Sequence, residues 1–120
     1  MKIIKREKAL VYEAGAHLEP LLTVKPGEKF KVETEDNFEQ ALIKKGNGVF
    51  DENDLPALKS APLKANPVAG PIYVEGVEPG DLLAVQIWDI IPGEKGWTGT
   101  VRGLGVLKDK VGWEECQVNY

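Results

Sequence analysis

One turn pattern, valine-x-proline-glycine-acid followed by three residues and a second valine, occurs twice and constrains the fold more than any other feature. It spans residues 24–32 and residues 77–85. Proline presets φ at the second position of a type II turn, and glycine accepts the positive φ required at the third. After the first turn, Phe30 and Val32 alternate with charged residues, as in a half-buried strand. The second turn opens a similar apolar alternation over residues 83–87, which predicts one turn solution used twice.

The remaining apolar runs are also short and separated by loop residues. Residues 9–12 and 18–24 predict strands, and residues 104–107 predict a further brief strand. Residues 46–64 are rich in Gly, Asn, Asp and Pro, and Pro56 limits any helix there to about one turn unless it occupies the first helical position. We therefore expect an all-β chain, a β-sandwich of jelly-roll type with long loops and at most one or two short helices.

Length and composition indicate the number of domains and the kinds of partner to expect. The chain has 120 residues, of which 42% are hydrophobic, so we expect one β-sandwich domain over residues 1–120. Its net charge is −4, with acids and bases interspersed, and a clustered cationic face for nucleic acid is missing from the sequence. No run is long and apolar enough to span a membrane, and the first residues lack the apolar core of a secretory signal. We expect no membrane partner and a cytoplasmic location.

Several familiar reaction centres lack the residues they need. The sequence contains one histidine, His17, and one cysteine, Cys116, which is too few for the usual zinc ligand sets or for a nucleophilic triad. A lone loop histidine is more often a solvated side chain than a base. The glycines at positions 103 and 105 lack the continuation of a phosphate-binding loop, so a bend beside a strand explains them better.

Acidic residues are the remaining candidates for chemistry. Asp36 follows the predicted strand of the first turn, where its carboxylate could cap the next turn or face a pocket. Glu75 follows a short apolar run, and Glu78 and Asp81 flank the second Pro-Gly pair as expected solvated turn positions. These residues alone do not specify a reaction.

Three segments carry a resemblance to a known family. The stretch NPVAGPIYVEGVEPGDLLAVQI, residues 66–87, closely resembles the N-P-x-T-G-P-I-x-V-x-G-A-x-P-G-D-x-L-x-V signature of the acetamidase/formamidase family. The stretches VKPGEKFKVETEDNF and GWTGTVRGLGVLKD are similar to segments of the family before and after it. Together they cover roughly residues 8–110. Ala69 stands where the family usually has threonine, and Val77 stands in place of alanine.

The resemblance implies the amino-terminal half of an amidase. The family hydrolyses short linear amides to the acid and ammonia on a β-sandwich of jelly-roll type. Its longer members carry a histidine-bearing segment in their second half that this sequence lacks. The resemblance therefore implies a small amide substrate and a second segment, or a homo-oligomer, that completes the site.

The resemblance also selects residues. Asp36 matches a family aspartate, and Asn66, Gly70, Glu75 and Gly76 match signature positions. We expect Asp36, Asn66 and Glu75 to be catalytic and the two glycines to line the substrate. Asp36 could position a water molecule or bind a divalent metal ion, whose presence the sequence leaves open, and Asn66 could donate to a carbonyl oxygen.

A non-catalytic alternative remains open. The same chain could be a β-sandwich that kept the fold and serves as an interaction or assembly subunit. Tryptophans at positions 88, 97 and 113 favour an interface, because aromatic rings are enriched where proteins associate. Prolines on both sides of Gly70 stiffen the backbone, which suits a sandwich corner as well as a preorganised site.

Overall fold

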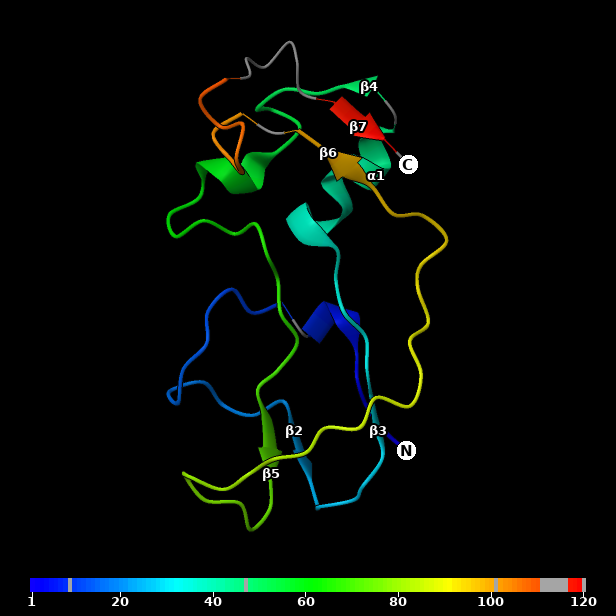
Figure 1. Cartoon of the computed structure of the whole chain (residues 1–120), viewed down its shortest axis with the longest axis vertical. Coiled ribbons are helices and arrows are strands. Elements are labelled where there is room, and N and C mark those ends of the chain that lie inside the picture. The colour runs from blue at the N-terminus through cyan, green and yellow to red at the C-terminus, as the bar shows by residue number, and fades with distance from the viewer. Residues whose placement is uncertain (9, 47, 101, 111–116, 120) are drawn as a thin grey trace. The chain divides into compact units, whose positions relative to one another are not determined.

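The computed structural model describes residues 1–120 except 9, 47, 101, 111–116 and 120. Short strands and coil dominate it, with few and short helices (Figure 1). This composition is compatible with the all-β prediction. In chain order the elements are β1 (Lys2–Ile4), η1 (Arg6–Lys8), β2 (Leu22–Val24), β3 (Phe30–Val32), η2 (Asn37–Gln40), α1 (Ala41–Lys45), β4 (Gly48–Val49), η3 (Pro56–Lys59), β5 (Ile72–Val74), β6 (Thr98–Gly99) and β7 (Gln117–Asn119), where η marks a 3-10 turn.

The chain divides into two compact units, each built from two separate stretches. Unit 1 comprises Met1–Glu35 and Pro67–Pro92, and unit 2 comprises Asp36–Asn66 and Gly93–Tyr120. The two units alternate along the chain. The prediction of one β-sandwich domain over residues 1–120 stays a prediction.

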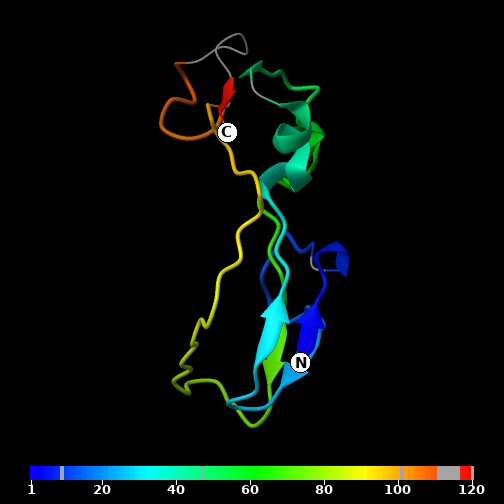
Figure 2. The ribbon, with the colours of Figure 1, turned by 90° about the vertical axis from the view of Figure 1, so that its right-hand side faces the viewer.

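Unit 1 contains two pairs of parallel strands. Strand β1 pairs with β3, with Ile4 opposite Val32, and β2 pairs with β5, with Val24 opposite Val74 (Figure 2). Ile4 and Val24 are both buried and 3% exposed. On β3, Phe30 and Val32 are half-buried while the residue between them is exposed, which confirms the predicted alternation.

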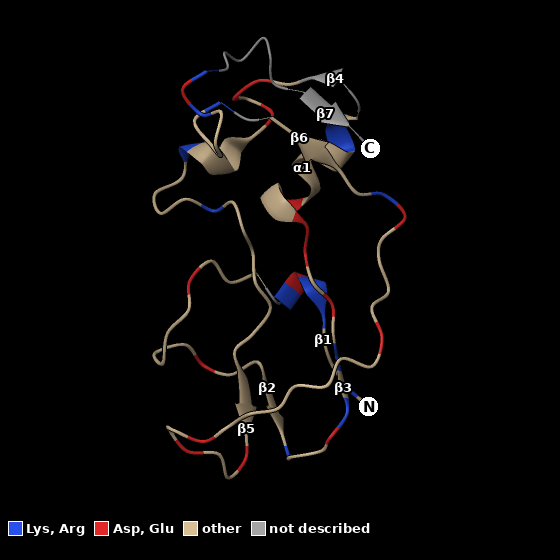
Figure 3. Cartoon of the chain, in the orientation of Figure 1, with Lys and Arg blue, Asp and Glu red and all other residues tan. Residues whose placement is uncertain are grey.

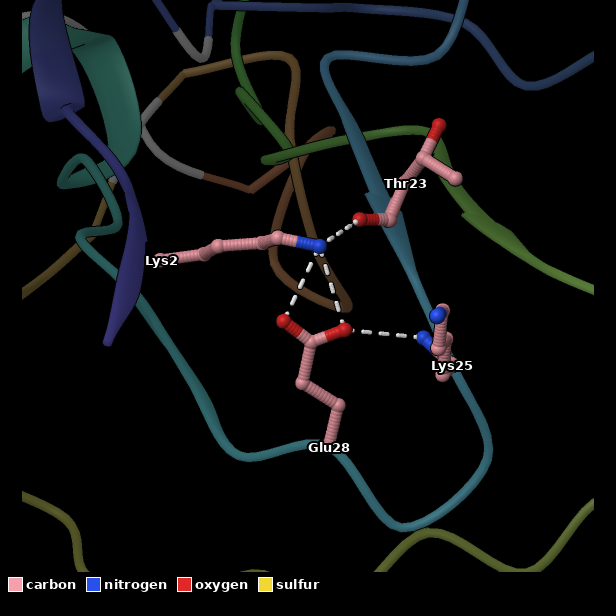
Figure 4. A network of polar contacts seen from close by, with 4 residues as sticks. All are labelled: Lys2, Thr23, Lys25 and Glu28. Atoms are coloured by element: carbon pink, nitrogen blue, oxygen red, sulfur yellow. Dashed lines mark hydrogen bonds and ion pairs between the residues drawn. The ribbon is translucent and has the colours of Figure 1, made fainter.

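The first Pro-Gly turn has the predicted geometry. The Glu28 backbone N–H donates to the Lys25 carbonyl over 3.0 Å, and Gly27 has a φ of 78°. The Glu28 carboxylate in turn accepts the Lys25 backbone N–H at 2.9 Å and pairs with Lys2 Nζ at 2.9 Å (Figure 4). Lys2 Nζ also donates to the Thr23 carbonyl at 2.7 Å. The acid of the pattern therefore closes the turn and ties it to β1.

The second Pro-Gly turn repeats this arrangement. The Asp81 backbone N–H donates to the Glu78 carbonyl over 3.1 Å, and the Asp81 carboxylate accepts the Glu78 backbone N–H at 2.9 Å. Gly80 has a φ of 101°. The prediction of one turn solution used twice is confirmed at the level of individual hydrogen bonds.

Unit 2 is organised around a small apolar core. Its members are buried side chains from η2, α1 and the loops that follow them: Phe38, Leu42, Phe50, Leu55 and Ala65. Trp97 and Leu104 pack against this core from the later part of the chain. Strands β4, β7 and β6 form an antiparallel sheet in that order. Pro56 occupies the start of η3, which is a single turn, as the sequence predicted.

Two of the predicted strands do not form in this structure, and a third is reduced to one bridge. Residues 83–87 lie in no strand and are exposed, because among the described residues no neighbouring strand pairs with them. Residues 104–107 form turns, since Gly103 and Gly105 adopt φ values of 81° and 70° that a strand does not accommodate. Of residues 9–12, Ala9 lies outside the described residues, and Val11 forms an isolated antiparallel bridge with Val68. The sheets formed by the described residues have two or three strands each. The structure is therefore compatible with the all-β class, and the jelly roll stays a prediction.

Charge is spread along the chain rather than collected. Figure 3 shows Lys and Arg interspersed with Asp and Glu along the ribbon of both units. Among the described residues, no helix has the length and apolar character needed to cross a membrane.

Candidate functional site

Asp36 is anchored by an aromatic side chain from a distant part of the sequence. Both of its carboxylate oxygens accept the Trp97 indole N–H, Oδ1 at 3.1 Å and Oδ2 at 2.9 Å. The Trp97 ring also packs against Phe38, with ring centroids 6.0 Å apart and planes tilted by 33°. The Asp36 side chain makes no capping hydrogen bond to η2, so the turn-cap alternative is wrong. The carboxylate is instead held half-buried beside the core of unit 2.

The backbone directly after Asp36 is strained. Phe38, Glu39 and Gln40 have φ values of 57°, 53° and 65°, in the left-handed region that side chains other than glycine rarely occupy. Such a conformation costs about 1–2 kcal/mol per residue. It is maintained here by the burial of Phe38 and by its backbone N–H, which donates to the Ala65 carbonyl over 3.0 Å. Strain of this kind concentrates at functional positions, and no glycine or asparagine at positions 38–40 signalled it in the sequence.

The backbone next to Asn66 is hydrogen-bonded to this strained turn. Asn66 directly follows Ala65, whose carbonyl bonds Phe38, so the fold joins the stretch after Asp36 to the stretch before Asn66. The Asn66 side chain is exposed. Two of the three predicted catalytic residues therefore lie on chain segments that a backbone hydrogen bond brings together.

The other predicted site residues belong to unit 1. Glu75 directly follows β5, its backbone N–H donates to the Val24 carbonyl at 2.9 Å, and its side chain is exposed. Gly76 has a φ of 77° and Gly70 a φ of 144°, and Gly70 is buried. Both glycines adopt conformations that a side chain would strain. Their backbone geometry explains why glycine stands there, and a substrate contact at either one stays a prediction.

A pocket of about 520 Å³ opens in unit 2 next to the strained turn. Its lining includes Phe38 and Glu39 from the turn, Asp54 and Leu55, and two lysines, Lys44 and Lys64. The Asp51 backbone N–H, followed by the side chain of Lys45, lowers the pKa of Asp54. Neither Asp36 nor Asn66 lines this pocket, so it is not assigned to the substrate.

A metal ion has no ligand set within the part of the chain that the structure describes. Over residues 1–110, with gaps at 9, 47 and 101, and 117–119, no three histidine, cysteine, aspartate or glutamate side chains come together. His17 is exposed and its Nε2 lies 3.2 Å from Glu13 Oε1, which agrees with a solvated loop residue. Cys116 and Trp113 lie outside the described residues. A divalent metal ion stays a prediction.

Comparison with known proteins identifies the family. A model of the acetamidase/formamidase family matches residues 7–118, and the chain belongs to that family. It is similar to an acetamidase from Mycolicibacterium smegmatis, with 43% identity over 70 residues that make up 58% of this chain and 16% of that protein. The chain thus spans only a small part of the length of this relative. No solved structure matches the chain.

Proposed function

We propose that this chain forms part of a hydrolase that cleaves the carbon–nitrogen bond of short linear amides, releasing the carboxylate and ammonia. The observation that carries the proposal is the family match over residues 7–118, which includes the signature stretch. The similar protein from Mycolicibacterium smegmatis is named an acetamidase, which supports an amide as the substrate.

Amide hydrolysis needs an activated water, a donor for the oxyanion and an acid for the departing amine. In this proposal Asp36 orients or deprotonates the water, and its orientation is fixed by the indole of Trp97. Asn66 donates its amide N–H to the substrate oxygen, and the proton released by the attacking water is delivered to the leaving nitrogen through Glu75. Gly70 and Gly76 allow the backbone to approach the substrate closely.

The proposal includes a second polypeptide segment. The matched residues are 16% of the acetamidase relative, so most of a family member of that size lies beyond the matched part. In the completed protein we expect the short strands to join a β-sandwich of jelly-roll type that acts on a small amide in the cytoplasm. The completing segment is a separate chain, a continuation or another copy in a homo-oligomer.

The test is ammonia release from formamide and acetamide. The chain is assayed alone and after mixing with the remainder of the acetamidase relative, expressed without its matched part. Activity that needs both components is the expected result. In the active mixture Asp36→Asn should abolish turnover and lower the free energy of unfolding by less than Asp36→Ala does, because the amide oxygen still accepts the Trp97 N–H. Turnover within about twofold of the unmodified mixture would remove Asp36 from the mechanism.

The alternative is a non-catalytic interaction or assembly subunit. The observation that favours it is the exposure of Trp88, which is 66% exposed on a largely apolar stretch. A chain that associates with the remainder but releases no ammonia, alone or in the mixture, would support this alternative.

A further inference from the structure

Residues 82–92, here called the exposed segment, are the most solvent-accessible apolar part of the described chain. Leu82 is 99% exposed, and Val85 and Ile91 are each 76% exposed. The segment is the yellow stretch of Figure 1, and in Figure 3 it is free of charge along nearly its whole length. Its one ionisable side chain is Asp89. A soluble protein rarely leaves such a continuous apolar stretch open unless another surface covers it.

Both faces of the exposed segment are apolar. In an extended chain, alternate side chains point to opposite faces. One face would carry Leu83, Val85 and Ile87, with Asp89 near its end, and the other would carry Leu82, Trp88 and Ile90, with Gln86 as its one polar residue. A strand at the surface of a sandwich has one polar face, whereas a strand covered on both faces reads as a nearly continuous apolar run. The sequence of the segment fits the second kind.

The backbone of the exposed segment is also unpaired. Residues 82–92 lie in no strand, and none of their backbone groups bonds to another described residue. Within unit 1, Lys29 Nζ lies 3.7 Å from the centre of the Trp88 ring. This side-chain contact leaves the hydrogen-bonding edges of the segment available for another strand.

A second copy of this chain would not cover both faces and both edges of such a segment. Two exposed segments paired edge to edge would each gain one neighbour and would still leave apolar side chains open on both faces. The rest of the family fold offers more, since the matched part is only 16% of the acetamidase relative. A large remaining portion can supply strands on both edges and a covering layer.

We infer that residues 82–92 are an interior strand of a sheet whose neighbouring strands come from the remaining part of the acetamidase/formamidase fold. Docking occurs by strand addition, in which backbone hydrogen bonds give affinity and alternate side chains give specificity. The partner surface is apolar on its inner face. This inference rests on the second segment of the proposed function, and it names where that segment binds.

The test is the association of this chain with the remainder of the Mycolicibacterium smegmatis acetamidase, measured by calorimetry. Val85→Lys should weaken association about 100-fold, because a buried cation lacks a partner in an apolar site. The matched control is Val106→Lys, at a position 98% exposed outside the segment. It should change the dissociation constant by less than about twofold. Since Val85 is exposed in the isolated chain, its substitution should leave the circular dichroism spectrum unchanged.

Hydrogen exchange gives a second readout. Amides of residues 82–91 should exchange rapidly in the chain alone and slow by about 100-fold or more in the complex. No association, or association insensitive to Val85→Lys, overturns the inference. Self-association of the chain alone that Val85→Lys abolishes also overturns it, in favour of a second copy. A complex sensitive to Val85→Lys that releases no ammonia refutes the proposed function only, and an active mixture insensitive to it refutes the inference only.

Discussion

The bond between Asp36 and Trp97 can be measured by a double-mutant cycle. Trp97→Phe removes the indole N–H but keeps an aromatic ring against Phe38, and Asp36→Ala removes the acceptor. Hydrogen bonds to charged groups contribute about 1.5–3 kcal/mol, and each single change removes the bond between the indole and the carboxylate. We therefore expect each to lower the free energy of unfolding by about that amount, with a coupling energy of similar size.

The assay is urea unfolding followed by far-ultraviolet circular dichroism, which does not depend on the tryptophan that is replaced. Trp88→Phe is the control, because Trp88 is 66% exposed. It should alter the free energy of unfolding by no more than about 0.5–1 kcal/mol, the size of an exposed cation–π contact. A coupling energy below about 0.5 kcal/mol between Asp36→Ala and Trp97→Phe would refute the anchoring of the carboxylate.

Three further predictions concern stability. Gly27→Ala should lower the free energy of unfolding by about 1–2 kcal/mol, because Gly27 has a positive φ. The control Gly96→Ala also places its methyl group in open space but has no positive φ, so it should raise the free energy of unfolding by about 0.4–1 kcal/mol. Equal urea midpoints for the two variants would contradict the turn geometry. Leu55→Ala should cost about 2–5 kcal/mol in the same titration, because the side chain is fully buried, and a loss below about 1 kcal/mol would count against the core. The Lys25 N–H and Lys2 lower the pKa of Glu28 from 4.5, so its stabilising contribution is complete above that pH and disappears as the pH falls through the lower folded-state pKa. Glu28→Gln should flatten this acid limb of a stability profile against pH, and an unchanged limb would show that other groups cause it.

Local features were predictable because their causes are local. The two Pro-Gly turns follow from the φ limits of proline and glycine and from an acid three residues after the first turn position. The position of Pro56 at the start of η3 follows from the same kind of rule. The alternation of half-buried and exposed side chains on β3 was also predictable, because Phe30 and Val32 alternate with charged residues.

Features that depend on distant partners could not be predicted. The apolar alternation of residues 83–87 shows that the stretch can be a strand, but a strand forms only where a neighbour supplies the other half of its hydrogen bonds. The anchoring of Asp36 by Trp97 joins residues 61 positions apart, and no spacing rule connects them. The left-handed turn at Phe38 carries no glycine that would mark it.

For the candidate site, the sequence supplied the identities of Asp36, Asn66 and Glu75 through the family resemblance. It did not supply their environment. The structure adds the indole contact, the strained turn and the backbone bond that joins the stretches around Asp36 and Asn66. The catalytic roles of these residues stay predictions, to be tested by ammonia release.

The parallel pairing in unit 1 has a consequence for synthesis on the ribosome. Strand β2 ends at Val24 and its partner β5 ends at Val74, so the whole of the stretch Asp36–Asn66 is translated between them. Pairing of strands so far apart requires closure of a long loop, which slows folding. The nascent chain must therefore keep β2 unpaired until β5 has emerged, and during that interval β2 is open to chaperones and to aggregation.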